Sequence, residues 1–321
     1  MSVVAGYLVG LRVVADESGA SAATTAATSV SVPVIETTGV GPSALASPAT
    51  TTQAPGIGLT LHEHSSDPSR IVAYRNERGV WLRGGQGGAF TEAGVPADDV
   101  AASPDGAWLA VQSGTGVMLV GRGDGRRFAV QVPSGAVSPT WDRASSRLLF
   151  TVSGKGTTGF AVLDVATRQV TTVVTEGDVG PYAWTPGGDG VVAGYDSGDG
   201  DGLRFRDLRG RQTRTMPWTG ASLGRMLFSP SGRLMLTTCP SGGSYCAWDA
   251  ATGVRVATYV NSIKGAEMWG WYGDDHLMIL DPTRTPHEFV AIDFREGTRR
   301  LLATLDAAGN TPGLRLARAA R

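Results

Sequence analysis

The sequence lacks a surplus of charge of either sign. Its 321 residues include 28 basic and 29 acidic side chains, which leaves a formal net charge of −1. Proteins that bind DNA or RNA usually present a clearly basic surface to the phosphate backbone. The composition therefore excludes nucleic acid as the expected partner.

Motifs of the common catalytic and cofactor sites are lacking as well. The chain contains no Gly-x-Ser-x-Gly nucleophile turn, no phosphate-binding loop, no paired-cysteine metal motif and no Asp-box repeat of the sialidase type. No cofactor is expected. An enzyme is therefore the less favoured interpretation, although catalytic residues can also come from scattered loops that no motif reveals.

The first apolar run is too short to cross a bilayer. Residues 3–14 are apolar apart from Arg12, whereas a transmembrane helix takes roughly 20 residues. A secretory signal would also carry a basic stretch ahead of the apolar one, and only Met1 and Ser2 precede it. We interpret residues 1–18 as the remnant of a membrane anchor or signal. The alternatives are a mobile tail and a helix that packs on the domain.

Residues 19–57 lack the composition of a folded segment. They are rich in Ser, Thr, Ala and Pro, carry Glu36 as their single charged residue and contain no aromatic side chain. Such a segment buries too little surface to offset the entropy of ordering it. We expect a disordered linker that carries a domain of residues 58–321, either as a bare spacer or with O-linked sugars.

Glycine, in contrast, is abundant. The chain has 45 glycines and 17 prolines, a balance that favours tight turns over a collagen-like or disordered chain. Turns of one kind recur before apolar strands, at Ser103-Pro104-Asp105-Gly106, Thr185-Pro186-Gly187-Gly188 and Ser229-Pro230-Ser231-Gly232. Pro104 and Pro186 are 82 residues apart, which is two steps of 41, and Pro230 follows 44 residues later.

A second landmark has the same period. An apolar residue followed by Asp ends a later strand at Leu163-Asp164, Trp248-Asp249 and Ile292-Asp293, with Arg206-Asp207 as a variant of the pattern. The steps between these aspartates are 43, 42 and 44 residues. A period near 42 is typical of a four-stranded propeller blade. We expect the turn residues and these aspartates to have structural roles, because they bond to the local backbone.

The expected fold is an all-β, six-bladed β-propeller. Six innermost strands are predicted near residues 98–103, 136–141, 180–185, 225–229, 268–272 and 313–317. The last of these has no strands after it, whereas strands near 70–74, 80–84 and 88–92 lack an innermost strand. The C-terminal strand should therefore complete the first blade and remove the open edges of the ring. Seven blades are the alternative if residues 58–64 add further strands.

These motifs resemble the bacterial TolB-like and WD-repeat-like propellers. The resemblance spans residues 70–317 and is carried by Ser103 to Gly106, Ser229 to Gly232, Leu163-Asp164 and Trp248-Asp249. It departs from WD repeats because the Gly-His element is absent. The resemblance implies an interaction scaffold in the periplasm or on the cell surface. Peptidase gating domains and lyases share such repeats, so the fold does not decide the function.

The only two cysteines, Cys239 and Cys246, flank a Gly-rich loop between two predicted strands. A hairpin would bring them close enough for a disulfide, which persists in an oxidising compartment. The alternative is a pair of reduced thiols. The disulfide and the linker together predict an extracytoplasmic protein.

Two sequence clusters are weak metal candidates. His62-Glu63-His64 has its histidines two apart, whereas zinc proteases place them four apart on one helix. Asp196, Asp199 and Asp201 could offer oxygen ligands to calcium, but the Glu of an EF-hand loop is missing. We therefore expect a surface cluster and a solvated turn.

Trp269, Trp271 and Tyr272 lie on the fifth predicted innermost strand. Alternation along a strand would place both indoles on one face. They then either pack between blades or form an aromatic platform for a ligand at the mouth of the channel.

Taken together, the sequence favours a non-enzymatic scaffold, tethered to a membrane or secreted, that acts as a single copy and binds a protein or an envelope ligand. A propeller hydrolase or lyase acting on an extracellular substrate is the alternative. Converging His, Glu, Asp or Arg side chains at the channel would favour the enzyme. A broad apolar rim would favour the binding protein.

Overall fold

A computed structural model describes residues 32–36, 41–42, 50–84, 88–154, 157–196, 198, 200–293, 295, 297–306 and 314–320. The chain divides into two compact units, residues 1–31 and 32–321. The predicted membrane-anchor remnant, residues 1–18, lies outside the described residues. Among the described residues, no helix is long and apolar enough to span a bilayer.

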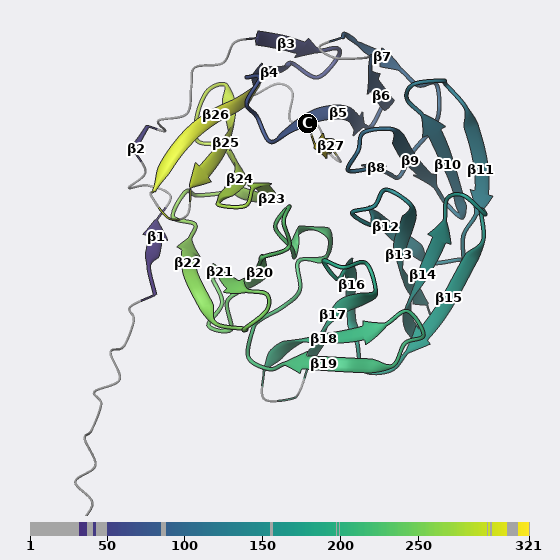
Figure 1. The fold of residues 1–321 in the computed structure, drawn as a ribbon. Helices are drawn as coiled ribbons and strands as arrows, with labels where there is room; N and C mark the ends of the chain where they lie inside the picture. The colour runs from purple at the N-terminus through teal and green to yellow at the C-terminus, as the bar shows by residue number, and fades with distance from the viewer. Residues whose placement is uncertain are drawn as a thin grey trace, which may run out of the picture. The chain divides into compact units, whose positions relative to one another are not determined.

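The described chain forms a six-bladed β-propeller, as the sequence predicts (Figure 1). Blade 1 joins β27 (Arg315–Ala320), β5 (Ser69–Asn76), β6 (Gly79–Arg83) and β7 (Phe90–Glu92). Blade 2 contains β8 (Asp99–Ala102), β9 (Trp108–Ser113), β10 (Gly116–Gly121) and β11 (Arg127–Gln131). Blade 3 contains β12 (Ala136–Trp141), β13 (Arg147–Gly154), β14 (Thr157–Asp164) and β15 (Val170–Thr175).

The other three blades follow in chain order. Blade 4 contains β16 (Val179–Trp184), β17 (Gly190–Asp196), β18 (Asp201–Asp207) and β19 (Gln212–Met216). Blade 5 contains β20 (Leu234–Thr238), β21 (Ser244–Asp249) and β22 (Arg255–Val260). Blade 6 contains β23 (Glu267–Gly273), β24 (His276–Asp281), β25 (His287–Asp293) and β26 (Thr298–Leu305).

The recurring turns connect each innermost strand to the next strand of its blade. In blade 2, the hydroxyl oxygen of Ser103 accepts a hydrogen bond from the Trp108 amide at 2.9 Å, and Gly106 adopts φ 69° to close the turn. Ser229 repeats this bond with the Leu234 amide at 3.2 Å. Asp249 accepts from the Thr252 amide at 2.8 Å. The predicted landmarks are therefore structural, because their side chains satisfy backbone donors in turns.

Blade 5 departs from the prediction at its innermost position. Instead of a strand at residues 225–229, the chain forms the 3-10 helix η2 (Gly224–Met226). Only two isolated bridges, Ser222 to Thr237 and Phe228 to Met235, connect this segment to β20. Gly224 has φ 56° and its Cα lies close to the Pro181 ring, so the segment bends where a regular strand would continue.

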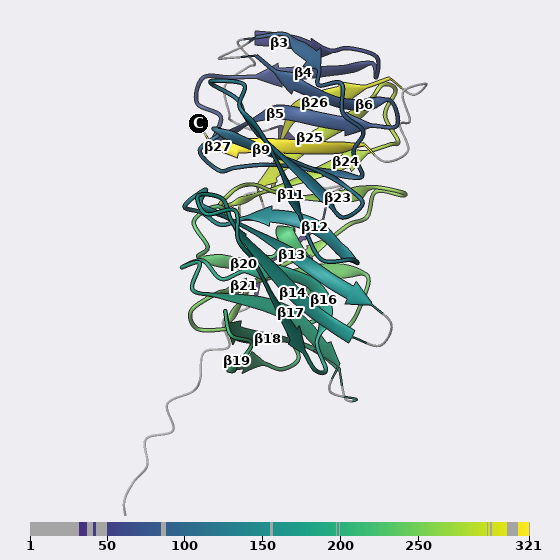
Figure 2. The ribbon, with the colours of Figure 1, turned by 90° about the vertical axis from the view of Figure 1, so that its right-hand side faces the viewer.

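The N-terminal boundary of the propeller also differs from the prediction. Strands β1 (Val34–Glu36), β2 (Gly41–Pro42) and β3 (Thr50–Ala54) lie inside the predicted linker, residues 19–57. β1 pairs in parallel with β22, and β2 pairs in parallel with β26. β3 and β4 (Leu59–Glu63) form a hairpin on the outer side of β26 (Figure 2). The added strands extend existing blades, so the seven-blade alternative is wrong.

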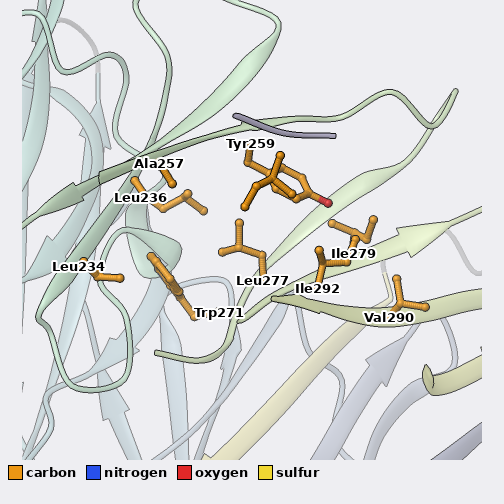
Figure 3. Packing of buried hydrophobic residues seen from close by; sticks show 11 residues of the cluster. Leu234, Leu236, Ala257, Tyr259, Trp271, Leu277, Ile279, Val290 and Ile292 are labelled. Atoms are coloured by element: carbon orange, nitrogen blue, oxygen red, sulfur yellow. The ribbon is translucent and has the colours of Figure 1, made fainter. Parts of the chain in front are cut away.

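The core is divided among the interfaces between neighbouring blades. Between blades 5 and 6, eleven buried side chains form one cluster, nine of which Figure 3 labels. Similar clusters lie between each other pair of neighbours, for example around Phe150 between blades 2 and 3 and around Phe160 between blades 3 and 4. Burial of these side chains, worth roughly 1.5–3 kcal/mol for each large apolar group, holds the blades together.

Candidate functional site

Two of the three residues of the predicted aromatic platform are buried, and the third, Trp269, is half-buried. Trp271 is 7% exposed and packs in the cluster between blades 5 and 6 (Figure 3), whereas Tyr272 is 6% exposed and packs with Met278 and Ala291. Trp269 contacts Phe289 edge to face, with ring centroids 5.0 Å apart. A bulge at Gly270, with φ 98°, breaks the alternation that the prediction assumed, so the two indoles do not share a face. The geometry supports the packing alternative.

The predicted disulfide is present. Cys239 and Cys246 are joined across the β20–β21 turn with their Cα atoms 5.0 Å apart, and both are buried. The bond closes a short loop at one end of blade 5, where the chain also lacks a regular innermost strand. It therefore adds a covalent link to a blade whose innermost position lacks a regular strand.

The metal candidates do not form a cluster. Glu63 pairs with Arg83, while His64 bonds to the Ser66 hydroxyl, so the His62-Glu63-His64 run does not converge. Asp196 accepts the Gly198 amide as an ordinary turn residue, and Asp201 lies in β18. Asp199 lies outside the described residues. Within the part of the chain that the structure describes, no three His, Cys, Asp or Glu side chains are placed to hold a metal ion.

An ion pair spans the centre of the ring. Arg225, in η2 of blade 5, lies with a guanidinium nitrogen 3.4 Å from a carboxylate oxygen of Asp99 in β8 of blade 2. Blades 2 and 5 are opposite each other in a ring of six (Figure 1). Both side chains keep some solvent exposure, 37% for Arg225 and 15% for Asp99. These two charged groups at the centre are thus paired with each other.

Exposed apolar side chains gather at one end of the ring. Because strands alternate in direction within a blade, the starts of the innermost strands and the ends of the outermost strands lie at the same end. Of the six large apolar residues that are exposed in the described chain, four lie at this end, on blades 3 and 4 and the connection to blade 5. These four, which we call the rim residues, are Val137, Val174, Val179 and Trp218.

Trp218 is the largest of the rim residues and lies in a loop that local contacts hold in place. It is 56% exposed and has φ 60°, a conformation that bulky residues rarely adopt. Its indole lies over Gly200, where a Cβ atom would come within 2.8 Å of the ring. The next residue, Thr219, is buried, and its hydroxyl donates to the Met216 carbonyl at 3.0 Å. The loop therefore presents an aromatic side chain to solvent at a cost in backbone strain.

A buried polar network stabilises blade 4 near this end. Asp178 has a fully buried side chain and accepts from Arg206 at 2.6 Å, from Arg204 at 2.8 Å and from the Tyr182 hydroxyl at 2.9 Å. Burial alone would raise the pKa of Asp178, but the bonds from Arg206, Tyr182 and Arg204 outweigh burial and lower it. Its carboxylate is fully used within the blade, so its role is structural.

Comparison with known proteins identifies the fold class. No protein-family model matches the sequence, and no curated protein matches it. TolB from Acinetobacter baumannii has a similar structure, with a TM-score of 0.55 and 16% identity over 81% of this chain and 67% of TolB. A chain of the nidogen/laminin complex matches with a TM-score of 0.53 and 10% identity, over 78% of this chain and 97% of that one.

A third similar structure is a TolB-like protein from Agrobacterium tumefaciens, with a TM-score of 0.49 and 15% identity over 78% of this chain and 99% of that one. The matches to TolB from Acinetobacter baumannii and to the nidogen/laminin complex, at identities this low, show the fold and leave the function open. The chain is a six-bladed propeller whose structure is similar to that of TolB, as its blade motifs predict.

Sequence reasoning missed three features of the surface. The Asp99–Arg225 pair joins residues 126 positions apart. The rim residues come from four separate segments and share no motif. A cavity between the first and last blades is lined by residues from both ends of the chain. The one available signal was Trp218, a tryptophan in a Pro- and Gly-containing loop, because apolar residues in such loops are often exposed for binding.

Proposed function

We propose that this chain is a non-catalytic binding propeller that holds a protein partner at the end of the ring carrying the rim residues. The observation that carries the proposal is Trp218, which is 56% exposed on a strained and well-anchored loop. Tryptophan is enriched among the residues that dominate binding energy at interfaces, and a rigid base lowers the entropy lost on binding. Val137 and Val179 add apolar surface at the same end.

The centre of the ring supports the same proposal. Two polar side chains there, Asp99 and Arg225, bind each other, which leaves neither as an unpaired catalytic candidate. The matched chain of the nidogen/laminin complex, which is similar in structure, is part of a complex between proteins. The propeller fold is thus compatible with a protein partner bound at one end of the ring.

We also infer an extracytoplasmic location, with the chain tethered to a membrane or secreted and acting as a single copy. The Cys239–Cys246 disulfide supports this inference, because such bonds persist in oxidising compartments. The similarity of the fold to that of TolB adds to this support.

Site-specific photo-cross-linking tests the proposed interface. A photoreactive amino acid is placed at Val179 and, as a matched control, at Val254, an equally exposed valine in the turn before β22 at the opposite end. In cells that naturally produce the chain, we expect a discrete adduct from position 179 and none from 254. Adding Trp218→Ala should reduce the adduct at least about tenfold.

Two outcomes would contradict the proposal. Equal yields of adduct from positions 179 and 254 would mean that no partner binds specifically at the rim residues. Absence of any adduct, combined with turnover of a substrate library by the purified protein, would favour the hydrolase or lyase alternative. Because Trp218 is exposed, loss of the adduct in Trp218→Ala with an unchanged melting temperature would report on binding and not on folding.

A further inference from the structure

Two exposed aspartates lie beside the Trp218 loop, at the end of blade 4 that carries the rim residues. Asp196 ends β17 and Asp201 begins β18, and the two are directly opposite each other in the register of these strands. The indole of Trp218 lies against Gly200, the residue before Asp201, and the Gly220 amide donates to the Asp201 carbonyl at 3.2 Å. We call Trp218, Asp196 and Asp201 the acidic corner.

The carboxylates of the acidic corner have no cationic partner in their own blade. Among the described residues, the ion pairs of blade 4 are Arg204–Asp178, Arg206–Asp178 and Arg211–Asp207. Like charges directly opposite each other on neighbouring strands repel and destabilise a sheet. A cation beside Asp196 and Asp201 would therefore relieve a repulsion that is present in the free protein.

Elsewhere in the ring, arginines lie between an aromatic ring and a carboxylate. The guanidinium group of Arg147 lies 4.8 Å from the ring centroid of Trp184, and its Nε atom is 2.9 Å from a carboxylate oxygen of Asp142. The same arrangement is formed by Arg83 with Phe90 and Glu63 and by Arg204 with Tyr195 and Asp178. An arginine can stack on an aromatic face and bond to a carboxylate at the same time, because its guanidinium group is planar.

The acidic corner has the aromatic ring and the carboxylates of this arrangement without the arginine. In the described part of the chain, the rings that an arginine covers are those of Phe90, Trp108, Phe128, Trp184, Tyr195, Phe205 and Tyr272. Trp218 is not among them, and 56% of its surface is exposed. The indole and the two carboxylates are thus available to a cation from another molecule.

We propose that the acidic corner binds an arginine side chain of the protein partner. The guanidinium group stacks on the exposed part of the Trp218 indole and bonds to Asp201 or Asp196. An apolar residue next to that arginine contacts Val179, which pairs with Gly194, two residues before Asp196. This inference rests on the proposed binding function and adds its specificity, since a partner surface that is acidic or lacks arginine would not satisfy the corner.

Titration with N-acetylarginine amide, followed by NMR, tests the recognition of a guanidinium group. The signal of the Trp218 indole N–H, assigned by its loss in Trp218→Phe, should shift in a saturable way. N-acetylcitrulline amide is the control, because it has the same shape with an uncharged urea group in place of the guanidinium. It should leave the signal unchanged over the same range of concentration.

A variant without the two charges tests the role of the aspartates. Asp196→Asn with Asp201→Asn should weaken binding of N-acetylarginine amide about fivefold, because two exposed ion pairs are lost. Asparagine keeps an oxygen for the Gly198 amide, which bonds to Asp196, so the turn should stay folded with an unchanged or higher Tm. Asp189→Asn, at an exposed position in the turn before β17, is the matched control and should bind as the wild type does.

Three results would overturn the proposal. They are an equal response of the Trp218 signal to the arginine and citrulline probes, wild-type affinity in the variant without the two charges, and no response to the arginine probe at any concentration that the protein tolerates.

Photo-cross-linking from position 179 separates this proposal from the proposed function. The variant without the two charges should give about fivefold less adduct than the wild type. If both give the same adduct, the partner interface stands and the recognition of arginine fails. If the wild type gives no adduct although the Trp218 signal responds to N-acetylarginine amide, the guanidinium site stands and the partner interface fails.

Discussion

At the interface between blades 3 and 4 and at the seam between blades 6 and 1, a side chain donates a hydrogen bond to a backbone carbonyl of the neighbouring blade. The side chains that do so differ between the two places. Between blades 3 and 4, the indole nitrogen of Trp184 on β16 donates to the Thr140 carbonyl on the neighbouring innermost strand at 2.9 Å. At the seam, Arg318 on β27 donates in the same way to the carbonyls of Trp271 and Tyr272. One donor is neutral and packs in an apolar cluster, whereas the other is charged.

The difference follows from how the chain reaches each interface. Blades 3 and 4 are consecutive, and the three residues that connect β15 to β16 already limit their register, while bonds such as that from Arg147 to the Gly188 carbonyl at 2.7 Å add to it. Blade 1 is assembled from two segments, and Arg318 contacts Ser69, which lies 249 residues earlier. There the position of a separate strand is fixed by directional bonds and by the buried Glu63–Arg83 pair. Directional contacts specify register where chain connectivity does not.

The largest expected effect comes from the apolar side of this comparison. Trp184 is 6% exposed, so Trp184→Ala leaves a cavity between blades 3 and 4 and should lower the free energy of unfolding by about 4 kcal/mol in urea titrations. Trp218→Ala is the matched control, since Trp218 is 56% exposed, and should change stability by less than about 1 kcal/mol. Equal losses of unfolding free energy in the two variants would show that the burial of each tryptophan does not determine its contribution to stability.

Removal of the ion pair at the seam should have a somewhat smaller effect. Glu63→Gln leaves the buried Arg83 without its counter-charge and should cost about 3 kcal/mol of unfolding free energy, measured in the same way. The control is Asp124→Asn, which breaks the exposed Arg126–Asp124 pair and should cause no measurable change. If Glu63→Gln proves as stable as the wild type, the seam is held by packing alone, and the contrast with blades 3 and 4 disappears.

The smallest expected effect is a change with pH in the stability difference between the wild type and Asp178→Asn, and it occurs only in acid. Asp178, in blade 4, has a pKa held below its ordinary value of 3.8, so its contribution to stability is complete above pH 3.8 and declines as the pH falls further. The difference in stability between the wild type and Asp178→Asn should therefore be constant from pH 7 to about pH 4 and shrink below that. Thermal unfolding across this range measures it. A difference that already shrinks between pH 7 and 5 would contradict the lowered pKa.

The sequence predicts the regular part of the fold well because the blade repeat is local. The predicted strand at residues 136–141 coincides with β12, and the C-terminal strand closes blade 1 as expected. Ser103 and Asp249 bond to amides within five residues, so their roles can be inferred from the sequence around them. Local hydrogen bonding is what a sequence pattern records.

The remaining features depend on contacts between distant segments. β1 pairs with β22 through backbone bonds more than 200 residues apart, and its sequence alone is that of a linker. The alternation assumed for Trp269 and Trp271 does not hold, because the bulge at Gly270 redirects the side chains around it. The rim residues and the cavity between the first and last blades likewise combine positions that come together only in the closed ring. A sequence pattern does not show which distant residues come together in the fold.

The Asp99–Arg225 pair gives the propeller a mechanical property that packing between neighbours does not provide. Six wedges in a ring can flatten without opening any interface, because each interface needs to tilt only slightly. A link along one diameter couples blade 2 to blade 5, which is not its neighbour in the ring. Since the pair is partly exposed, dissolved salt weakens it. The stiffness of the ring should therefore decrease as ionic strength rises.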